Sequence, residues 1–298
     1  MAESAVQVLR RWRPLRPDRP GQLTMRRRVL PGFGLSLGFT VTYLGLIVLL
    51  PLSALAWKAS EIGLAGIPRL LSSPRTLAAF KLSFGGALVA ASINVVVGLM
   101  VTWALVRYRF PGRRILDALI DLPFALPTAV AGIALTAVYA PNGWLGRWLV
   151  PLGIQVAYAP LGVLVAMVFV GFPFVVRTLQ PVLQSLERDV EDAAESLGAS
   201  RLQTFVKVVL PTLLPTLLTG FALALARAVG EYGSVIFIAG NIPLRSEIAP
   251  LLIVQRLEEF DYATAAALGV VMLAFSLVLL ILISMLQRWT RRWAEQHA

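Results

Sequence analysis

Six long stretches of this chain contain no charged residue, and this feature restricts its fold more than any other. They cover residues 33–57, 82–106, 122–146, 148–176, 208–226 and 262–287, and each is at least 19 residues long. About 20 apolar residues in a helix cross the ~30 Å of hydrocarbon in a bilayer. The hydrophobic share of 57% and the charged share of 14% also depart from those of soluble domains. The sequence therefore predicts an all-α membrane protein with six transmembrane helices.

The pattern also predicts how the chain is divided. Residues 1–24 are polar and give little to bury, so we expect a disordered cytoplasmic N-terminal arm. Residues 25–298 then form one membrane domain. Its spans are expected at about 33–57, 80–106, 117–140, 157–179, 208–239 and 262–287.

The lysines and arginines predict the orientation of these spans. Nineteen of the 27 basic residues fall on one side of a six-span arrangement, in the segments 10–28, 107–114, 177–207 and 288–292. Loops rich in Lys and Arg face the cytoplasm. Both termini are therefore expected in the cytoplasm, which suits a protein of the bacterial inner membrane that contacts lipid. The net charge of +11 is spread between uncharged stretches, which argues against a nucleic-acid partner.

The absence of certain residues excludes several kinds of chemical site. Without cysteine, the chain has no disulfide or thiolate metal site, and its single histidine is His297. No Gly-Lys dipeptide occurs, so a phosphate-binding Walker A loop is absent. We expect no catalytic residue, no metal and no cofactor in this chain.

The segment 183–211 between the fourth and fifth spans contains several helix signals that a simple connecting loop would not need. Gly198 stands where a helix end favours glycine, and Ser200 through Gln203 matches a capping box that opens the next helix. Acidic residues, among them Glu191, Asp192 and Glu195, lie opposite an apolar stripe with helical spacing. The stripe consists of Leu183, Leu186, Val190, Ala193 and Leu197. We therefore expect a helix, a tight turn and a second helix that leads through Leu210 and Pro211 into the fifth span.

This segment resembles the EAA motif of ATP-binding-cassette (ABC) importer permeases. Asp192-Ala193-Ala194 is followed by Gly198 and, after nine residues, by Val208-Val209-Leu210-Pro211. The motif has Glu and Ile where this chain has Asp192 and Val208. The resemblance implies a type I importer (MetI-like) permease, in which the segment is the coupling helix that docks on a separate ATPase. The residues so implied are Glu191, Asp192, Ala193, Ala194, Glu195, Gly198, Leu210 and Pro211.

Other segments are similar to the sulfate/thiosulfate permease subunits of CysT type. The run RYRFPGRRILDALIDLPFALPTAVAGIAL at 107–135 carries most of this similarity, and GEYGSVIFIAGNIP at 230–243 is shared with molybdate permeases. The resemblance implies an importer complex for sulfate or thiosulfate. Its other members would be a second permease subunit of W type, two copies of an ATP-binding subunit, and an external sulfate- or thiosulfate-binding protein. Molybdate or tungstate is the alternative substrate.

Charged residues and glycines near the end of the fifth span are candidates for the translocation pathway or its gate. Arg227 and Glu231 lie four residues apart on one helix face, and Gly230, Tyr232 and Gly233 surround the glutamate. Charges within a membrane span usually mark function. The pair either attracts and orients a divalent anion or serves packing between helices or subunits. Both interpretations stay open, as does the choice between a bend and close packing at the glycines.

Two further predictions concern polar residues of the second and third spans. Asp117 and Asp121 are four residues apart and would repel an anion, so we expect them to pair with Arg113 or Arg114. Asn94 is expected to hydrogen bond to a neighbouring helix. An autonomous ion-driven transporter is the competing class of function, but such folds usually carry an internal repeat and this sequence has none.

Overall fold

The computed structural model describes residues 33–63 and 65–297, so the expected arm at 1–24 lies outside the described residues. The described residues are helical and contain no strand, which confirms the all-α class. The chain divides after Pro51 into two compact units. Helix α2 (Phe33–Leu44) belongs to the first unit and continues through a π-helical turn (Gly45–Leu49) into α3 (Leu50–Ser60), most of which belongs to the second unit. The first expected span is therefore helical throughout.

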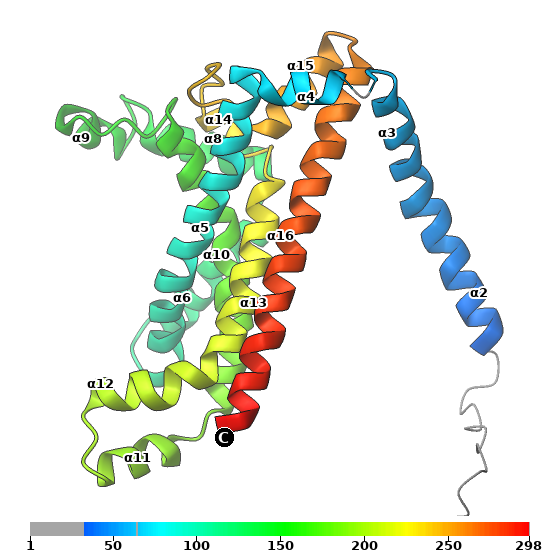
Figure 1. The fold of residues 1–298 in the computed structure, drawn as a ribbon. Helices are drawn as coiled ribbons and strands as arrows, with labels where there is room; N and C mark the ends of the chain where they lie inside the picture. The colour runs from blue at the N-terminus through cyan, green and yellow to red at the C-terminus, as the bar shows by residue number, and fades with distance from the viewer. Residues whose placement is uncertain (1–32, 64, 298) are drawn as a thin grey trace, which may run out of the picture. The chain divides into compact units, whose positions relative to one another are not determined.

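Four long helices form the packed part of the second unit. They are α5 (Pro74–Arg107), α10 (Pro160–Ser185), α13 (Leu210–Val229) and α16 (Tyr262–His297). Helix α10 packs against α5 and α13, and α13 packs against α16 (Figure 1). Small residues permit this closeness: a Cβ on Gly98 of α5 would lie 2.8 Å from Cγ1 of Val175 on α10. Van der Waals packing at such contacts drives helix association in lipid.

The third expected span is not one continuous helix. The structure divides it into α6 (Arg113–Ile120), α7 (Leu122–Ala125) and α8 (Thr128–Tyr139). Pro123 lies in the first turn of α7, and Pro127 precedes α8. Proline lacks the N–H that a helix interior requires, which explains the breaks. Alone, α8 is about 18 Å long, which is short of a full membrane crossing.

The fifth expected span also ends earlier than predicted. Helix α13 stops at Val229, and residues 230–248 return into the bundle with only one short helix, α14 (Val235–Ile238). Val235, Ile238 and Ile248 of this segment are fully buried. Non-helical backbone at membrane depth survives where protein surrounds it. The segment leads into α15 (Ala249–Glu258), which lies with α4 (Gly66–Ser72) at the same end of the bundle (Figure 1).

The described residues contain five helices long and apolar enough to cross a membrane. They cover Phe33–Ser60, Pro74–Arg107, Pro160–Ser185, Arg201–Val229 and Tyr262–Arg288, and the shorter apolar α8 belongs to the third expected span. The elbow helices α11 (Arg188–Ser196) and α12 (Arg201–Thr204) lie at the opposite end of the bundle from α4 and α15 (Figure 1). The chain between spans four and five therefore forms a separate projection.

Candidate functional site

The elbow turns at Gly198. This glycine has φ +84°, a left-handed conformation that side chains disfavour. Its N–H donates to the carbonyl of Glu195, and the next N–H, of Ala199, donates to Ala194. These two bonds form a Schellman motif, which ends α11. The expected capping box opens α12: the N–H of Gln203 donates to Ser200 Oγ, and the N–H of Ser200 donates to Gln203 Oε1.

The apolar stripe predicted on one helix is divided between two. Leu183 lies in α10 and is fully buried, whereas the backbone is extended at Leu186 and Glu187 before α11 begins. On α11, Val190 and Ala193 are exposed, and Leu197 is 89% exposed. The prediction of one helix across 183–197 was therefore wrong. The elbow presents apolar side chains to the outside of the chain.

The carboxylates of α11 differ in their surroundings. Glu191 faces the bundle and forms an ion pair with Arg107, which is the last residue of α5. The side chains of Asp192 and Glu195 are exposed, and within the described residues neither forms a hydrogen bond or an ion pair. Of the predicted alanines, Ala193 is exposed and Ala194 is half-buried. Of the three predicted coupling carboxylates, Asp192 and Glu195 are therefore available to another protein.

Arg107 joins the elbow to the second span. Its side chain is only 10% exposed and also donates to the carbonyl of Leu186 at 3.3 Å. Its guanidinium lies 5.6 Å from the ring centre of Trp103, which packs edge-on against Phe205. We call Arg107 and Glu191 the elbow clamp. It borders a hollow of about 300 Å3 whose lining includes Asp192 and Glu195.

Leu210 and Pro211 stand where the elbow enters the fifth span. A π-helical turn (Phe205–Val209) connects α12 to α13, so the chain is helical from Arg201 to Val229. Pro211 directly follows the π-helical turn, at the second residue of α13. A displacement of the elbow therefore acts on a continuous helix.

Asp117 and Asp121 bind a different arginine from the predicted ones. Arg177 of α10 donates through Nε and Nη2 to the two Asp121 oxygens, at 2.7 and 2.6 Å, and through Nη1 to Asp117 Oδ1 at 2.8 Å. It also donates to the carbonyl of Asp117 and to Gln180. The expected pairing with Arg113 or Arg114 was wrong. Arg177 instead holds the interrupted third span against α10.

Arg227 and Glu231 meet as their spacing predicts. Arg227 Nη1 donates to Glu231 Oε2 at 2.5 Å. The other carboxylate oxygen accepts from the backbone N–H and the hydroxyl of Ser234, both at 2.8 Å. The Glu231 side chain is 1% exposed and that of Arg227 is 32% exposed. Glu231 is thus fixed by three donors, while the arginine keeps an accessible guanidinium.

The glycines beside Glu231 have different surroundings. Gly230 caps the end of α13. A Cβ on Gly233 would lie 2.1 Å from Thr128 Oγ1 at the start of α8, and one on Gly132 of α8 would lie 2.4 Å from the Ser234 carbonyl oxygen. Close packing against the third span therefore requires Gly233. The half-buried Tyr232 packs against the main core cluster.

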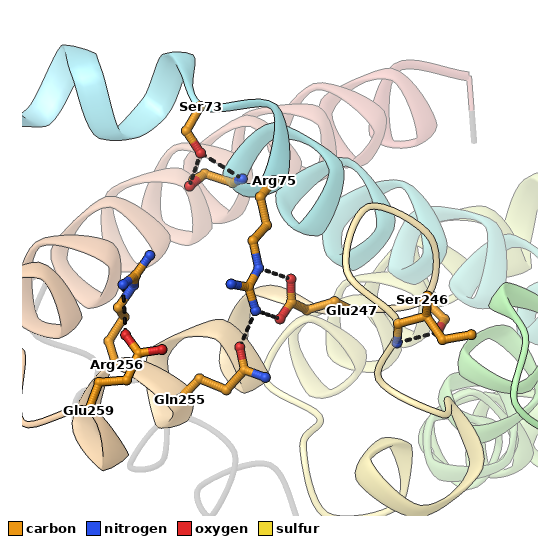
Figure 2. Close-up of polar contacts among 9 residues, drawn as sticks. Ser73, Arg75, Ser246, Glu247, Gln255, Arg256 and Glu259 are labelled. Carbon is orange, nitrogen blue, oxygen red and sulfur yellow. Dashed lines mark hydrogen bonds and ion pairs between the residues drawn. The ribbon is translucent and has the colours of Figure 1, made fainter.

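Sequence reasoning missed a polar cluster at the end of the bundle opposite the elbow. Arg75 donates to both oxygens of Glu247, at 2.8 and 2.6 Å, and also to Gln255 (Figure 2). A second tie lies nearby, where Ser83 Oγ accepts from the N–H of Ala249 at 2.8 Å. These contacts fasten the 230–248 segment and α15 to the start of α5. A separation of 172 residues between Arg75 and Glu247 left no local pattern to find.

Two remaining polar predictions concern Asn94 and metal binding. Asn94 is 1% exposed, and both polar atoms of its side chain lack a hydrogen-bond partner among the described residues. Its amide instead faces Gly171, where a Cβ would lie 2.7 Å from Nδ2. The expected interhelical hydrogen bond is therefore not formed. Within 33–63 and 65–297, no three histidine or carboxylate side chains gather to hold a metal ion.

Interrupted helices, an arginine paired with a buried glutamate at the end of a span, and a projecting elbow together suit a membrane permease. A family model described as "Binding-protein-dependent transport system inner membrane component" matches residues 94–293. The chain therefore belongs to this family of inner-membrane transport subunits.

Individual relatives give a more specific similarity. The chain is 52% identical over 256 residues to the "Sulfate transport system permease protein CysT" of Synechocystis, which covers 86% of this chain and 90% of that one. It is also 52% identical over 267 residues to the protein of the same description from Escherichia coli, with 89% and 96% covered.

The fold is also found among solved structures. A bacterial alginate ABC transporter, solved in complex with its alginate pentasaccharide-bound periplasmic protein, matches with a TM-score of 0.69 at 16% identity. The match covers 86% of this chain and 94% of that chain. At this identity the likeness establishes the architecture, which is that of an ABC importer permease.

Proposed function

We propose that this chain is the permease subunit of an ABC importer that moves sulfate or thiosulfate into the cytoplasm. The observation that carries the substrate class is the 52% identity to two sulfate permeases over 86% and 89% of this chain. The chain itself performs no hydrolysis, because it has no Gly-Lys dipeptide and therefore no Walker A loop. ATP hydrolysis belongs to a separate subunit.

The elbow supplies the contact with that ATPase. Asp192 and Glu195 are exposed on α11, and the exposed Leu197 stands beside the turn. A partner cleft with basic and apolar side chains would complement this surface. When two ATP-binding subunits close on ATP, the elbow moves with them. The elbow clamp passes this movement to α5, and the continuous helix from Arg201 passes it to α13.

We infer the rest of the complex from the family. A second permease subunit of W type would complete the pore, and an external binding protein would deliver the anion. The alginate transporter of the same fold was solved with its periplasmic protein, which supports a partner of this kind. The elbow end of the bundle would then face the cytoplasm, in agreement with the lysine and arginine distribution.

Arg227 is the residue we assign to the anion near the outer mouth. From Pro211 to Arg227 the helix rises about 24 Å, so the side chain lies in the outer half of the membrane. Within the described residues, Arg227 donates one hydrogen bond, to Glu231, and keeps its remaining N–H groups for a passing oxyanion. Glu231 orients the guanidinium and reduces its net charge. A weak site of this kind permits release, which transport requires.

Transport by the whole complex in proteoliposomes tests the proposal. We expect ATP-dependent uptake of radiolabelled sulfate, which thiosulfate inhibits by competition. Stronger inhibition by molybdate than by thiosulfate would favour the alternative substrate. Sulfate uptake driven by an ion gradient, with this chain alone and no ATPase, would overturn the importer assignment in favour of a secondary transporter.

A further inference from the structure

The loop between α5 and α6, together with the first turn of α6, borders a hollow of about 450 Å3 that the transport function does not use. It is lined by Arg109, Phe110, Gly112, Arg113, Arg114 and Ile115. Arg109 and Arg114 are exposed, and Arg113 is half-buried. Because the lining comes from one short segment, we call this group the α6 cradle.

The positive charge of the α6 cradle is not compensated within the described chain. None of its three arginine side chains forms an ion pair or a hydrogen bond to another described residue. The acidic residues nearest in sequence are Asp117 and Asp121, and Arg177 occupies both carboxylates. The opening of α6 adds to the preference for an anion, because Gly112 provides no side-chain cap for the first N–H groups of the helix.

Apolar side chains accompany these arginines. Phe110, Ile115 and Leu119 are all exposed, at 36%, 67% and 51%. Tyr108 is also exposed and follows the last residue of the membrane-spanning α5. Aromatic rings concentrate at the interface between lipid and water, and arginine stems lie along apolar surface while their head groups reach polar surroundings. The α6 cradle therefore combines basic head groups with a surface suited to acyl chains.

We propose that the α6 cradle binds an anionic phospholipid, with the phosphate diester between Arg109, Arg113 and Arg114 and the acyl chains along Ile115 and Leu119. Basic pockets at the cytoplasmic ends of membrane helices bind acidic head groups in this way. The ATPase is a poorer occupant. A partner that complements the acidic Asp192 and Glu195 presents basic groups, and these repel the cradle.

Lipid titration of the purified full chain in neutral detergent tests the site. Native mass spectrometry would compare short-chain phosphatidylglycerol with short-chain phosphatidylcholine. We expect tighter binding of phosphatidylglycerol, weakened by salt. Each basic group near an anionic surface contributes roughly fivefold in affinity, so R109Q/R113Q/R114Q should lose on the order of 100-fold at low salt. R109K/R113K/R114K should retain most of the binding.

A matched control replaces exposed arginines at the other end of the bundle. R69Q/R245Q removes positive charge there and should bind phosphatidylglycerol as the unmodified chain does. Equal binding of the two lipids, or unchanged binding by the triple glutamine variant, would overturn the proposal. If that variant fails to fold, the lipid preference and salt dependence of the unmodified chain decide.

Two further competition measurements distinguish other ligands of the α6 cradle. Inorganic phosphate at millimolar concentration should not displace the lipid, and displacement would mean a site for free anions. Displacement by the ATP-binding subunit would assign the surface to that protein instead. The inference rests on the proposed orientation only for the choice of leaflet. Because transport is not measured, its failure leaves the assignment as a sulfate permease untouched.

Discussion

Removal of the elbow clamp should uncouple ATP hydrolysis from transport. We consider Arg107→Met, which keeps the length of the side chain, and Glu191→Gln, which keeps its shape. Each removes one charge of the pair and leaves the other in a largely enclosed position, because Arg107 is 10% and Glu191 is 22% exposed. The tie between the elbow and α5 is then weaker, whereas the connection of the elbow to α13 is unchanged.

The size of the effect follows from the contacts. A hydrogen bond to a charged group contributes about 1.5–3 kcal/mol, and breaking a fully buried pair costs ~3–5 kcal/mol. Because both side chains retain some contact with solvent, we expect about 2–3 kcal/mol for either single substitution. That corresponds to a shift of about 30- to 150-fold toward an elbow released from α5.

The assay is the number of sulfate ions imported per ATP hydrolysed by the assembled complex in proteoliposomes. We expect both single variants to hydrolyse ATP while this ratio falls at least tenfold. The double variant replaces both partners, so it should recover most of the lost thermal stability but not the ratio. Recovery of stability without recovery of the ratio would show that the elbow clamp positions the elbow for coupling and does not act only on stability.

Glu187→Gln provides the matched control for the clamp. Its carboxylate precedes α11, is exposed and caps no backbone N–H, so the ratio should stay unchanged. An unchanged ratio in both single variants and in the double variant would refute the reasoning.

Three other substitutions probe the remaining features. Gly198→Val places a β-branched residue at φ +84°, which costs at least about 1–2 kcal/mol, so this variant should insert into the membrane normally but lose uptake. Gly198→Asn should retain uptake, because asparagine tolerates the left-handed conformation. Full uptake by the valine variant would contradict the coupling assignment. Arg227→Ala should reduce ATP-driven sulfate transport severalfold, with Arg227→Lys in between; normal rates would leave only a packing role. Arg75→Ala leaves the buried Glu247 without its bidentate partner, so it should lower the free energy of unfolding by about 1–3 kcal/mol and with it the thermal unfolding midpoint. Substitution of the exposed Arg69 by alanine should leave the midpoint unchanged. Equal midpoints for the two variants would contradict the role of this cluster.

Local patterns in the sequence predicted the elbow in detail. The turn at Gly198 and the capping box at Ser200 each depend on residues within a few positions of one another, and both formed as expected. The proximity of Arg227 and Glu231 was predictable for the same reason. Long apolar stretches likewise gave the helical class, because hydrocarbon demands internally bonded backbone.

The misses arose where distant residues decide the structure. Spacing along the chain favoured Arg113 or Arg114 as partners of the aspartates, but the guanidinium of Arg177 reaches them across the bundle. The fifth span ends at Val229 because Glu231 accepts hydrogen bonds from Ser234 and Gly233 packs against Thr128, a contact between segments far apart in sequence. Composition alone cannot distinguish such a break from a continuous apolar helix.

The interrupted third span has a consequence for how the protein is made. Asp117 and Asp121 lie 60 and 56 residues before Arg177, so both carboxylates leave the ribosome well before their counter-ion is synthesised. Pro123 and Pro127 also leave backbone groups that lipid cannot satisfy. The ion pairs that hold the interrupted third span against α10 can therefore form only after the fourth span has been synthesised.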